Sequence, residues 1–299
     1  MTATRVAITP HVPLRRRDRD LLAESIAIQA HRALLHELAA WPKPGLVSHV
    51  DNGSHRDMNA ALLRTSAEVL RPFFAELACA GQGLAGMNRL RAIGLRAEAA
   101  MLRATGGINT HRGAIFGLGL LCAAAGTAAS RSRGGAVLVT SPLGSIVARR
   151  WGDDIRRGPI PLFSHGSAVL RQHGARGARA EAAYGFPSVY DIGLPTLRLA
   201  RALAPYDAAA APVQTCFALI AAVRDINLLH RGGAEGARFA ADAAANFLSD
   251  GGVGAPDWRA RAAAVHAGFV ARNLSPGGCA DLLAMTLLVD ALESGTALP

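Results

Sequence analysis

The first long apolar run of the chain, residues 21–40, repeats its hydrophobic residues with the period of an α-helix. Positions three and four apart lie on one helical face, and here they are held by Leu22, Ile26, Ala30, Ala33, Leu34 and Leu38. Pro42 and Pro44 end the run, because proline lacks the amide hydrogen that a helix interior needs and disfavours helix in the residue before it. The sequence therefore predicts a long helix over 21–40.

Composition extends this expectation to the whole chain. Alanine, leucine and arginine favour helices, whereas aromatic residues, which sheets prefer, make up only 5% of the sequence. We expect an all-α fold, a single globular bundle of about ten helices, with one catalytic domain over residues 20–299 and a flexible basic tail over 1–19. Further helices are predicted at 57–80, 87–104, 112–129, 166–183, 190–204, 212–229, 234–250, 256–273 and 278–294.

The sequence of residues 135–150 is ambiguous. Their sequence, GAVLVTSPLGSIVARR, gives no clear helical period, and 136–140 could form a short strand. A single strand has nothing to pair with in an otherwise helical chain. The segment is therefore assigned to neither class.

The formal net charge of +10 indicates an anionic partner, such as nucleic acid, acidic lipid or a phosphorylated small molecule. An arginine- and alanine-rich background, typical of a GC-rich genome, accounts for part of this charge. The four cysteines are far apart in the sequence and are expected to be reduced thiols. We find neither a signal peptide nor an apolar stretch of roughly 18 residues. A cytoplasmic protein that does not bind membranes is expected.

Polar residues gather in five segments at the ends of predicted helices. The first segment, 41–58, contains the only lysine of the chain, and a Pro-Lys-Pro-Gly turn opens it. So many short polar groups in one loop indicate a binding site rather than a turn alone. Its candidate site residues are Lys43, Ser48, Asp51, Asn52, Ser54, His55 and Asp57.

The second segment, 105–113, places Asn109, His111 and Arg112 at the start of a predicted helix. Free amide groups and the positive end of the helix dipole favour a phosphate at such a position. No P-loop pattern occurs in the chain. The segment therefore predicts a phosphate site of another kind.

The remaining segments have the same character. In the fourth, Arg224, Asn227 and Arg231 would share one face of a helix, with Asp225 beside them. Each segment alone is consistent with helix capping, but all five together predict a charged pocket between helices. The residues of the third segment are His165, Arg179 and Glu181, and those of the fifth are Ser275 and Asp281.

These segments, in this order, resemble the triphosphoribosyl-dephospho-CoA synthase family. Its members make the prosthetic-group precursor for the acyl carrier subunits of citrate lyase and malonate decarboxylase. Arg56 and Arg112 stand where lysine is frequent in the family, and Ile226 stands where threonine is usual, which puts a hydroxyl role there in doubt. The resemblance spans about residues 35–293, and its matching text is KPGLVSHVDNGSHRDM, GGINTHRGAIFGLG, SHG with ARAEAAYGFPSV, RDINLLHRGG and NLSPGGCADLLAMTLLVDALE.

The resemblance implies an all-α pentosyltransferase that joins the triphosphoribosyl group of ATP to the 2′-hydroxyl of 3′-dephospho-CoA and releases adenine. Because the family's product is α-linked and ATP is β, it implies one inverting displacement with oxocarbenium character. Such a step needs a base for the hydroxyl, help for the departing adenine and cations for the phosphates. The expected functional partners are a phosphoribosyl-dephospho-CoA transferase and an acyl carrier protein, that of malonate decarboxylase rather than citrate lyase. The oligomeric state stays open, with a homodimer among the options.

Roles follow from these requirements as hypotheses. Asp57 is the first choice for the general base and Asp225 the second, while His55 would protonate adenine. Lys43 would bind a phosphate as a point charge. The triphosphate would be held by His111 and Arg112, with Arg231 assisting. The candidate ligands for a Mg²⁺ that enters with ATP, partly through water, are Asp51, Glu181 and Asp281; the other candidate substrate contacts are Ser48, Asn52, Ser54, Asn109, His165, Arg179, Asn227 and Ser275.

Two other functions use the same residues. A metal-dependent phosphohydrolase or ADP-ribosyl hydrolase on an all-α scaffold would employ water as the acceptor. A basic nucleic-acid-binding module would explain the charge, but the aromatics are few and acids are interleaved with the basic residues, which repels a phosphodiester backbone. The sequence therefore favours the transferase.

Overall fold

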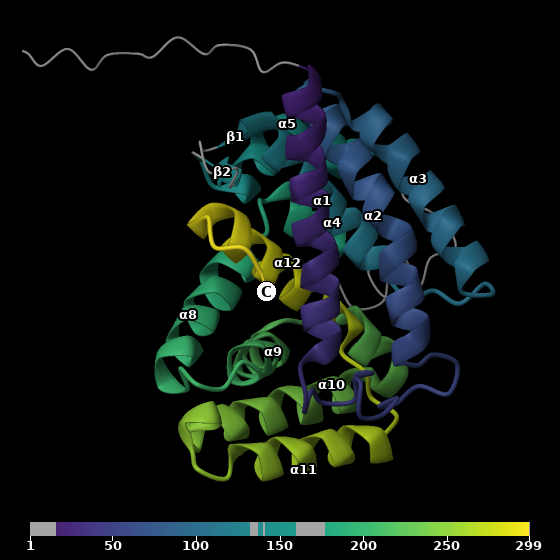
Figure 1. Cartoon of the computed structure of the whole chain (residues 1–299). Helices are drawn as coiled ribbons and strands as arrows, with labels where there is room; N and C mark the ends of the chain where they lie inside the picture. The colour runs from purple at the N-terminus through teal and green to yellow at the C-terminus, as the bar shows by residue number, and fades with distance from the viewer. Residues whose placement is uncertain (1–15, 132–136, 140, 160–176, 299) are drawn as a thin grey trace, which may run out of the picture.

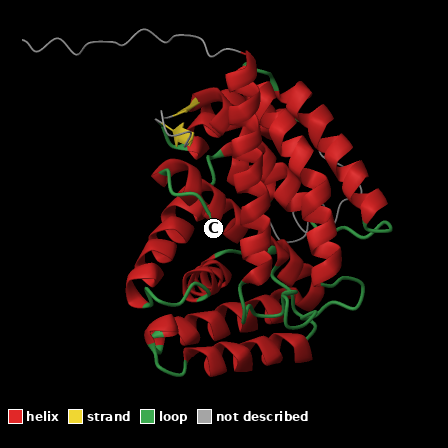
Figure 2. Cartoon of the chain, viewed as in Figure 1, coloured by secondary structure: helices red, strands yellow, loops and turns green. Residues whose placement is uncertain are grey.

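The computed structural model of the chain describes residues 16–131, 137–139, 141–159 and 177–298. α-Helices carry nearly all the regular structure of these residues, which confirms the all-α prediction (Figures 1 and 2). A π-helical turn (Ser188–Gly193), a 3₁₀ turn (Gly252–Gly254) and two short strands, β1 (Ala129–Arg131) and β2 (Val137–Val139), complete the elements. The helices are α1 (Arg16–Ala39), α2 (Ala60–Gln82), α3 (Met87–Ala104), α4 (Arg112–Ala128), α5 (Leu143–Arg157), α7 (Ala178–Ala183), α8 (Leu194–Leu203), α9 (Ala210–Ala222), α10 (Ile226–Ser249), α11 (Trp258–Ala271) and α12 (Gly277–Ser294).

Helix α4 occupies the middle of the bundle. α2, α3, α5 and α12 pack against it, and α1 packs against α2 and α12 (Figure 1). α9 packs between α8 and α10, while α10 and α11 lie side by side across the lower end of the molecule in this view. The loop between α1 and α2 reaches the same end, where Ser54 Oγ donates to the carbonyl of Leu274 at 2.6 Å. The first predicted polar segment therefore meets the last one.

Helices α2 and α4 contact each other backbone to backbone because glycines stand where they cross. A Cβ atom at Gly81 would lie 1.9 Å from the carbonyl oxygen of Ala123, and one at Gly126 would lie 2.0 Å from that of Ala78. Any larger residue at either position would push the helices apart, since a packed interior has no room to absorb it. This contact fixes α4, whose first residues line the site, against α2.

Two helix starts differ from their predicted positions. α1 begins at Arg16, with Asp18 in its first turn, where the helix dipole favours an acid. Residues 16–19 therefore belong to the helix and not to the predicted flexible tail. α2 begins at Ala60 rather than near Asp57, because the side chain of Asn59 accepts the amide of Leu62 at 2.9 Å and caps the helix.

The break between α9 and α10 falls at residues 223–225, inside the helix predicted over 212–229. Asp225 is the N-cap of α10, and its Oδ1 accepts the amides of Asn227 at 2.7 Å and Leu228 at 3.3 Å. Gly233, with φ 61°, kinks α10 without ending it. The prediction that Arg224 shares a helical face with the residues after it is therefore wrong, because Arg224 precedes the helix.

The ambiguous segment 135–150 contains both a strand and a helix. β2 pairs antiparallel with β1, which begins at the last residue of the helix predicted over 112–129, so the possible strand has a partner. α5 follows Pro142 directly, and its buried residues are Leu143, Gly144, Ile146, Val147, Trp151, Gly152 and Ile155. The helix predicted over 166–183 is described only from residue 177, where it contains α7.

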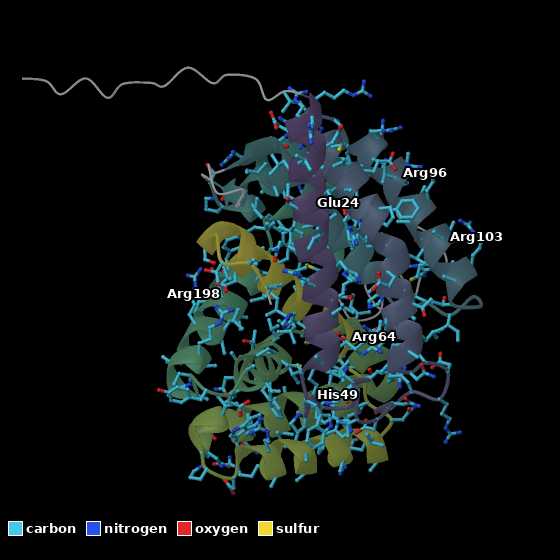
Figure 3. All side chains as sticks on the ribbon, in the orientation of Figure 1. Glu24, His49, Arg64, Arg96, Arg103 and Arg198 are labelled. Atoms are coloured by element: carbon cyan, nitrogen blue, oxygen red, sulfur yellow. The ribbon has the colours of Figure 1, made fainter. Side chains whose placement is uncertain are left out.

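Much of the positive charge lies on the outer faces of the helices. Figure 3 labels Arg96 and Arg103 on α3 and Arg198 on α8, all pointing outward. Arg96 forms an ion pair with Glu76, and Arg198 lies 3.4 Å from Asp290. No single described helix is long and apolar enough to cross a membrane; α9 and α10 meet that test only as a pair bent by 59°.

Candidate functional site

One cavity of about 830 Å³ lies where α4, α7, α10 and α12 begin and where the loop after α1 passes. Residues from each of the five predicted segments line it. His165 lies outside the described residues, and the predicted residues of the third segment that are described, Arg179 and Glu181, lie on α7. The predicted site residues that the structure brings together at this cavity are His55, Asn109, His111, Arg112, Arg179, Glu181, Asp225, Asn227, Arg231, Ser275 and Asp281.

Lys43 does not reach this cavity. Its side chain is fully buried, and its ammonium group donates to the backbone carbonyl of Glu37 at 2.5 Å and to the Glu37 carboxylate. The predicted phosphate contact is therefore wrong in this structure, because the ammonium is enclosed by protein. Lys43 instead balances the charge of Glu37, whose own side chain lines the cavity.

Two of three predicted substrate contacts in the same loop hold the loop together instead. Ser48 Oγ accepts the amides of Val50 at 3.1 Å and Asp51 at 3.4 Å. Ser54 donates to the Leu274 carbonyl, as described above, and Asn52 is exposed outside the cavity. Ser48 and Ser54 are turn and anchor groups, and neither they nor Asn52 line the cavity.

Asp51 also lies away from the cavity. Its Oδ1 accepts the amide of Gly53 at 2.7 Å and lies 3.1 Å from His266 Nε2. His266 Nδ1 in turn lies 2.7 Å from the carbonyl oxygen of Lys43. The aspartate therefore fastens the loop to α11 and is not available as a metal ligand in the cavity.

His55 connects an arginine to a serine at the cavity wall. Arg231 donates to His55 Nδ1 at 3.2 Å, and His55 Nε2 lies 2.8 Å from Ser275 Oγ. Since a guanidinium can only donate, Nδ1 must accept, and the ring proton of neutral His55 then lies on Nε2 and is shared with Ser275. Burial, with the charge of Arg231, lowers the pKa of His55. The ring is therefore poorly suited to its predicted role as an acid, because it is neutral and its proton is already donated.

Asp57 stands outside this arrangement. Its carboxylate lies 3.6 Å from His55 Nδ1, its side chain is 62% exposed, and it does not line the cavity. A general base must reach the substrate hydroxyl directly or through one water. The geometry therefore favours Asp225, the second choice, over Asp57.

Asp225 is buried and joins the starts of two helices. Besides capping α10, its Oδ2 accepts the amide of Cys279 on α12 at 2.8 Å. Burial raises the pKa of Asp225, while the backbone amides that it accepts oppose this shift. These amide bonds favour the ionised carboxylate, which is the form that a base requires.

Asp281 lies against the start of α4. A Cβ atom at Gly113 would stand 2.0 Å from Asp281 Oδ2, and the carboxyl accepts the backbone amide of Ala114. Burial, reinforced by the charges of Glu37 and Asp225, raises the pKa of Asp281 well above its usual range. The phosphate position predicted at the start of α4 is thus already occupied by the carboxyl group of Asp281.

His111, at the same helix start, is neutral rather than cationic. Burial, together with the positive charge of Lys43, lowers the pKa of its imidazole to about 4. Its Nδ1 lies 2.7 Å from Ser66 Oγ on α2. A neutral imidazole can still donate a hydrogen bond to a substrate, and His111 lines the cavity, so its contact with the triphosphate stays a prediction.

Three of the predicted cations at the cavity are engaged by the protein itself. Arg231 donates to the carbonyl oxygen of Ser54 at 2.9 Å and to Asn273 Oδ1 at 3.1 Å, besides its contact with His55. Arg112 forms an ion pair with Glu98 at 2.5 Å. Arg179 donates to the carbonyls of Ile155, Gly158 and Pro159, which ends α5. Arg179 thus acts chiefly as a helix C-cap, whereas Arg112 presents a charge that its partner partly balances.

The three predicted Mg²⁺ ligands do not form one site. Asp51 lies against His266, and Asp281 lies at the start of α4. Glu181 accepts hydrogen bonds from the hydroxyl group of Ser188 at 2.7 Å and from the amide of the same residue at 3.2 Å. Across the described parts of the chain, no group of three or more His, Cys, Asp or Glu side chains could hold a metal ion. The three candidate ligands therefore do not converge on one ion, and a Mg²⁺ that enters with ATP stays a prediction.

Sequence comparison adds the family to this geometry. Residues 23–299 match the model of a family described as ATP:dephospho-CoA triphosphoribosyl transferase. The chain belongs to this family. A protein of Azotobacter vinelandii named probable 2-(5″-triphosphoribosyl)-3′-dephosphocoenzyme-A synthase is 40% identical over 280 residues, which are 92% of this chain and 94% of the relative. A protein of Pectobacterium atrosepticum, named 2-(5″-triphosphoribosyl)-3′-dephosphocoenzyme-A synthase, is 40% identical over 267 residues, 86% of this chain and 85% of the relative. No solved structure matches the chain significantly.

In this triphosphoribosyl transferase the cavity also holds charged residues that were not among the predicted site residues. Arg224 lines it and makes no hydrogen bond or ion pair with any residue in the part that the structure describes. Arg156 lies at the wall near Tyr184, in a helix that the sequence did not reveal. Glu37 could have been found only from its pairing with Lys43, six residues further along the chain.

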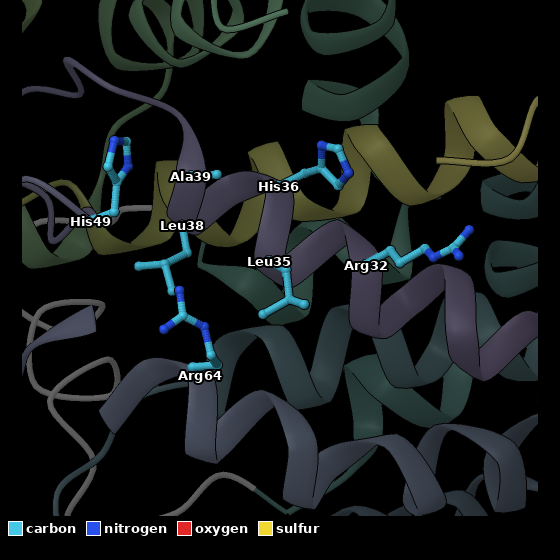
Figure 4. Close-up of a pocket in the computed structure, with 7 residues that line it drawn as sticks. All are labelled: Arg32, Leu35, His36, Leu38, Ala39, His49 and Arg64. Carbon is cyan, nitrogen blue, oxygen red and sulfur yellow. The ribbon is translucent and has the colours of Figure 1, made fainter. Parts of the chain in front are cut away.

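A smaller pocket of about 300 Å³ lies between α1 and α2 (Figure 4). Its basic side chains are Arg32, His36, His49 and Arg64, and Arg32 is bonded to the carbonyl oxygen of Leu298 at 2.6 Å. None of the predicted site residues lines it. The transferase site is therefore assigned to the larger cavity.

Proposed function

We propose that the chain transfers the 5-triphosphoribosyl group of ATP to the 2′-hydroxyl of 3′-dephospho-CoA and releases adenine. Family membership supports this pair of substrates. The observation that carries the proposal is a single cavity that brings the carboxyl groups of Asp225 and Asp281 together with several arginines, among them Arg224 and Arg231. Its volume of about 830 Å³ lies within the usual range of small-molecule sites.

The proposed reaction exchanges one bond at the anomeric carbon. The C1′–N9 bond of ATP breaks, and its electron pair leaves with adenine. The 2′-oxygen of dephospho-CoA forms the new bond to the same carbon, and its proton passes to a carboxylate. Formation of an α-linked product from β-configured ATP requires one inverting displacement, with oxocarbenium character in the transition state.

Asp225 and Asp281 are suited to the two proton roles. Asp225 accepts three backbone amides, which stabilise its ionised form, so we assign it as the base for the 2′-hydroxyl. Asp281 accepts one backbone amide and is raised further in pKa by neighbouring acids, so it keeps its proton and can supply it to adenine. Two carboxyl groups whose environments separate their pKa values are a common arrangement for acid–base catalysis.

The triphosphate would lie toward the start of α10. Arg224 and Arg231 stand there, and Ser275 and Asn227 add neutral hydrogen-bonding groups. Because the predicted metal ligands do not converge, we expect any Mg²⁺ to enter as part of the ATP substrate, coordinated by phosphate and water. Guanidinium groups would then share the phosphate charge with the ion.

Mass spectrometry of the nucleotides formed from ATP and dephospho-CoA tests the proposal. We expect free adenine and the triphosphoribosyl adduct in equal amounts, both dependent on dephospho-CoA. Release of inorganic phosphate without adenine would instead identify the all-α phosphohydrolase, and ADP-ribose hydrolysis would identify the ADP-ribosyl hydrolase. A steep, salt-dependent shift of RNA or DNA in a gel would support the nucleic-acid module.

The next partners in the pathway follow as part of the proposal. The product would pass to a phosphoribosyl-dephospho-CoA transferase and then to an acyl carrier protein, for which malonate decarboxylase is the favoured client. Co-expression with each carrier protein, followed by mass measurement of the carrier, distinguishes malonate decarboxylase from citrate lyase. The homodimer stays a prediction, which sedimentation of the purified chain tests.

A further inference from the structure

A chain of two hydroxyl groups lies behind His111. Thr110 Oγ1 donates to Ser66 Oγ at 2.8 Å, and Ser66 Oγ lies 2.7 Å from His111 Nδ1. Ser66 comes from α2 and is fully buried, and His111 is 7% exposed. These contacts link α2 to the start of α4 at the cavity wall.

The direction of this chain fixes the position of the imidazole proton. A serine hydroxyl has one proton, and since Ser66 Oγ accepts from Thr110, its own proton is directed to His111 Nδ1. An accepting Nδ1 leaves the proton of the neutral ring on Nε2. Burial and the Lys43 charge lower the pKa of His111 to about 4, which keeps the ring neutral near pH 7. Among the described residues, none bonds to Nε2.

We propose that Ser66 is a positioning residue that holds His111 in the Nε2–H tautomer, and that this N–H is the donor offered to the departing adenine. The second half of this inference rests on the proposed function. Adenine gains negative charge as the C1′–N9 bond breaks, and its ring nitrogens carry the lone pairs that accept hydrogen bonds. A fixed donor in a buried wall stabilises such charge more than a mobile water does.

A neutral donor suits this wall better than a cation. His111 is buried and close to the positive charge of Lys43, so both desolvation and that lysine oppose an imidazolium at this position. A neutral N–H keeps its direction and leaves the proton of Asp281 in place. In the proposed step His111 transfers no proton: the hydroxyl proton goes to Asp225, and Asp281 supplies the proton that adenine gains.

Nitrogen-15 NMR of the histidine rings in the full chain tests the tautomer without any substrate. We expect His111 to be neutral at pH 7 with its proton on Nε2, and the His111→Gln variant assigns its signals by their loss. Ser66→Ala should remove the shift of a hydrogen-bonded Nδ1, and Ser66→Thr should restore it. Thr110→Val removes only the Thr110 hydroxyl. It serves as a second variant if the protein interior has no room for the methyl group that Ser66→Thr adds. A proton on Nδ1, or a charged ring at pH 7, would overturn the assignment.

Turnover tests the contact with adenine. The amide nitrogen of glutamine can replace Nε2–H, whereas that of asparagine replaces Nδ1–H, so His111→Gln should keep more kcat than His111→Asn. We expect His111→Asn to lower kcat on the order of 10²-fold and Ser66→Ala to lower it about tenfold, both with ATP KM nearly unchanged. Equal loss in the two His111 variants would reject the contact while the NMR result stood. If the parent enzyme released no adenine, the proposed function would fail and the tautomer would still be decided by NMR.

Discussion

The starts of α4 and α10 both face the cavity, yet they carry charge in different ways. At α4, the carboxyl group of Asp281 arrives from α12, and the nearby imidazole of His111 is neutral. At α10, Asp225 caps its own helix and two arginines, Arg224 and Arg231, stand beside it. Both helices have the same dipole, so the dipole alone does not decide where an anion binds. The side chains around each helix start do, and in the proposed function the phosphates would bind at α10 and the adenine at α4.

The largest expected effect comes from the acid on the α4 side. Asp281→Asn keeps the shape of the side chain but removes its transferable proton, so kcat should fall on the order of 10²- to 10⁴-fold, with ATP binding changed less than threefold. Steady-state adenine release and ATP titration measure the two quantities. Asp57→Asn is the matched control, since that exposed carboxylate lies outside the cavity. A larger loss in Asp57→Asn than in Asp281→Asn would reverse the comparison.

The buried pair behind α4 should matter to stability. Lys43→Met leaves the Glu37 carboxylate buried without its partner, which should lower the free energy of unfolding by about 3–5 kcal/mol. The double variant Lys43→Met/Glu37→Gln should recover much of this loss, because no unpaired charge remains. Urea unfolding measures both variants. If Lys43→Met were as stable as the parent and only ATP affinity fell, the original phosphate role would have to be restored.

The arginine on the α10 side should control substrate affinity. Arg224→Gln removes a cation that no described residue engages, so ATP should bind about tenfold to a hundredfold more weakly, while the stability of the protein changes little. Arg103→Gln on the outer face of α3 is the control of equal charge. Calorimetric titration with ATP compares them. Equal affinities in the two variants would remove Arg224 from the phosphate site.

The smallest expected effect concerns pH. His111 has a folded-state pKa of about 4, below its ordinary value of 6.5, so the unfolded chain binds more protons than the folded one between these values. Stability is therefore present in full above pH 6.5 and is lost as the pH falls toward 4, by about 2 kcal/mol between pH 7 and 5. His111→Gln should lose less over the same interval. The raised carboxyl pKa values of Asp225 and Asp281 act in the opposite direction in both the parent and His111→Gln, so they cancel when the two stability profiles are subtracted. Identical pH profiles for the two proteins would show that His111 titrates normally.

Helices with strong periodicity could be predicted from the sequence, and features that depend on distant partners could not. The predicted helix 87–104 matches α3 in full. α5 was missed because the Ser-Pro-Leu-Gly sequence before it is typical of a turn, although proline also precedes helices. The cap at Asp225 was visible in the sequence, but the apolar residues on either side of it favoured one continuous helix.

The candidate site was predictable as a set of loops and not as a set of roles. Eleven predicted residues meet at one cavity: His55, Asn109, His111, Arg112, Arg179, Glu181, Asp225, Asn227, Arg231, Ser275 and Asp281. Charge, however, depends on what surrounds each group. The sequence could not show that Lys43 is enclosed with Glu37, or that the same lysine helps to keep His111 neutral. It singled out Lys43 correctly as unusual and assigned it to the wrong partner.

The glycine crossing of α2 and α4 has a mechanical consequence for the hydroxyl chain. Ser66 sits about four turns from Gly81 along α2, and His111 opens the helix that contains Gly126. A methyl group at Gly126 would push α4 away from α2 at their crossing. The same displacement would move Ser66 on α2 relative to His111 at the start of α4. A substitution at Gly126 would therefore lower the rate of catalysis without any contact with the substrate. Variants with reduced activity should be sought first at this helix crossing.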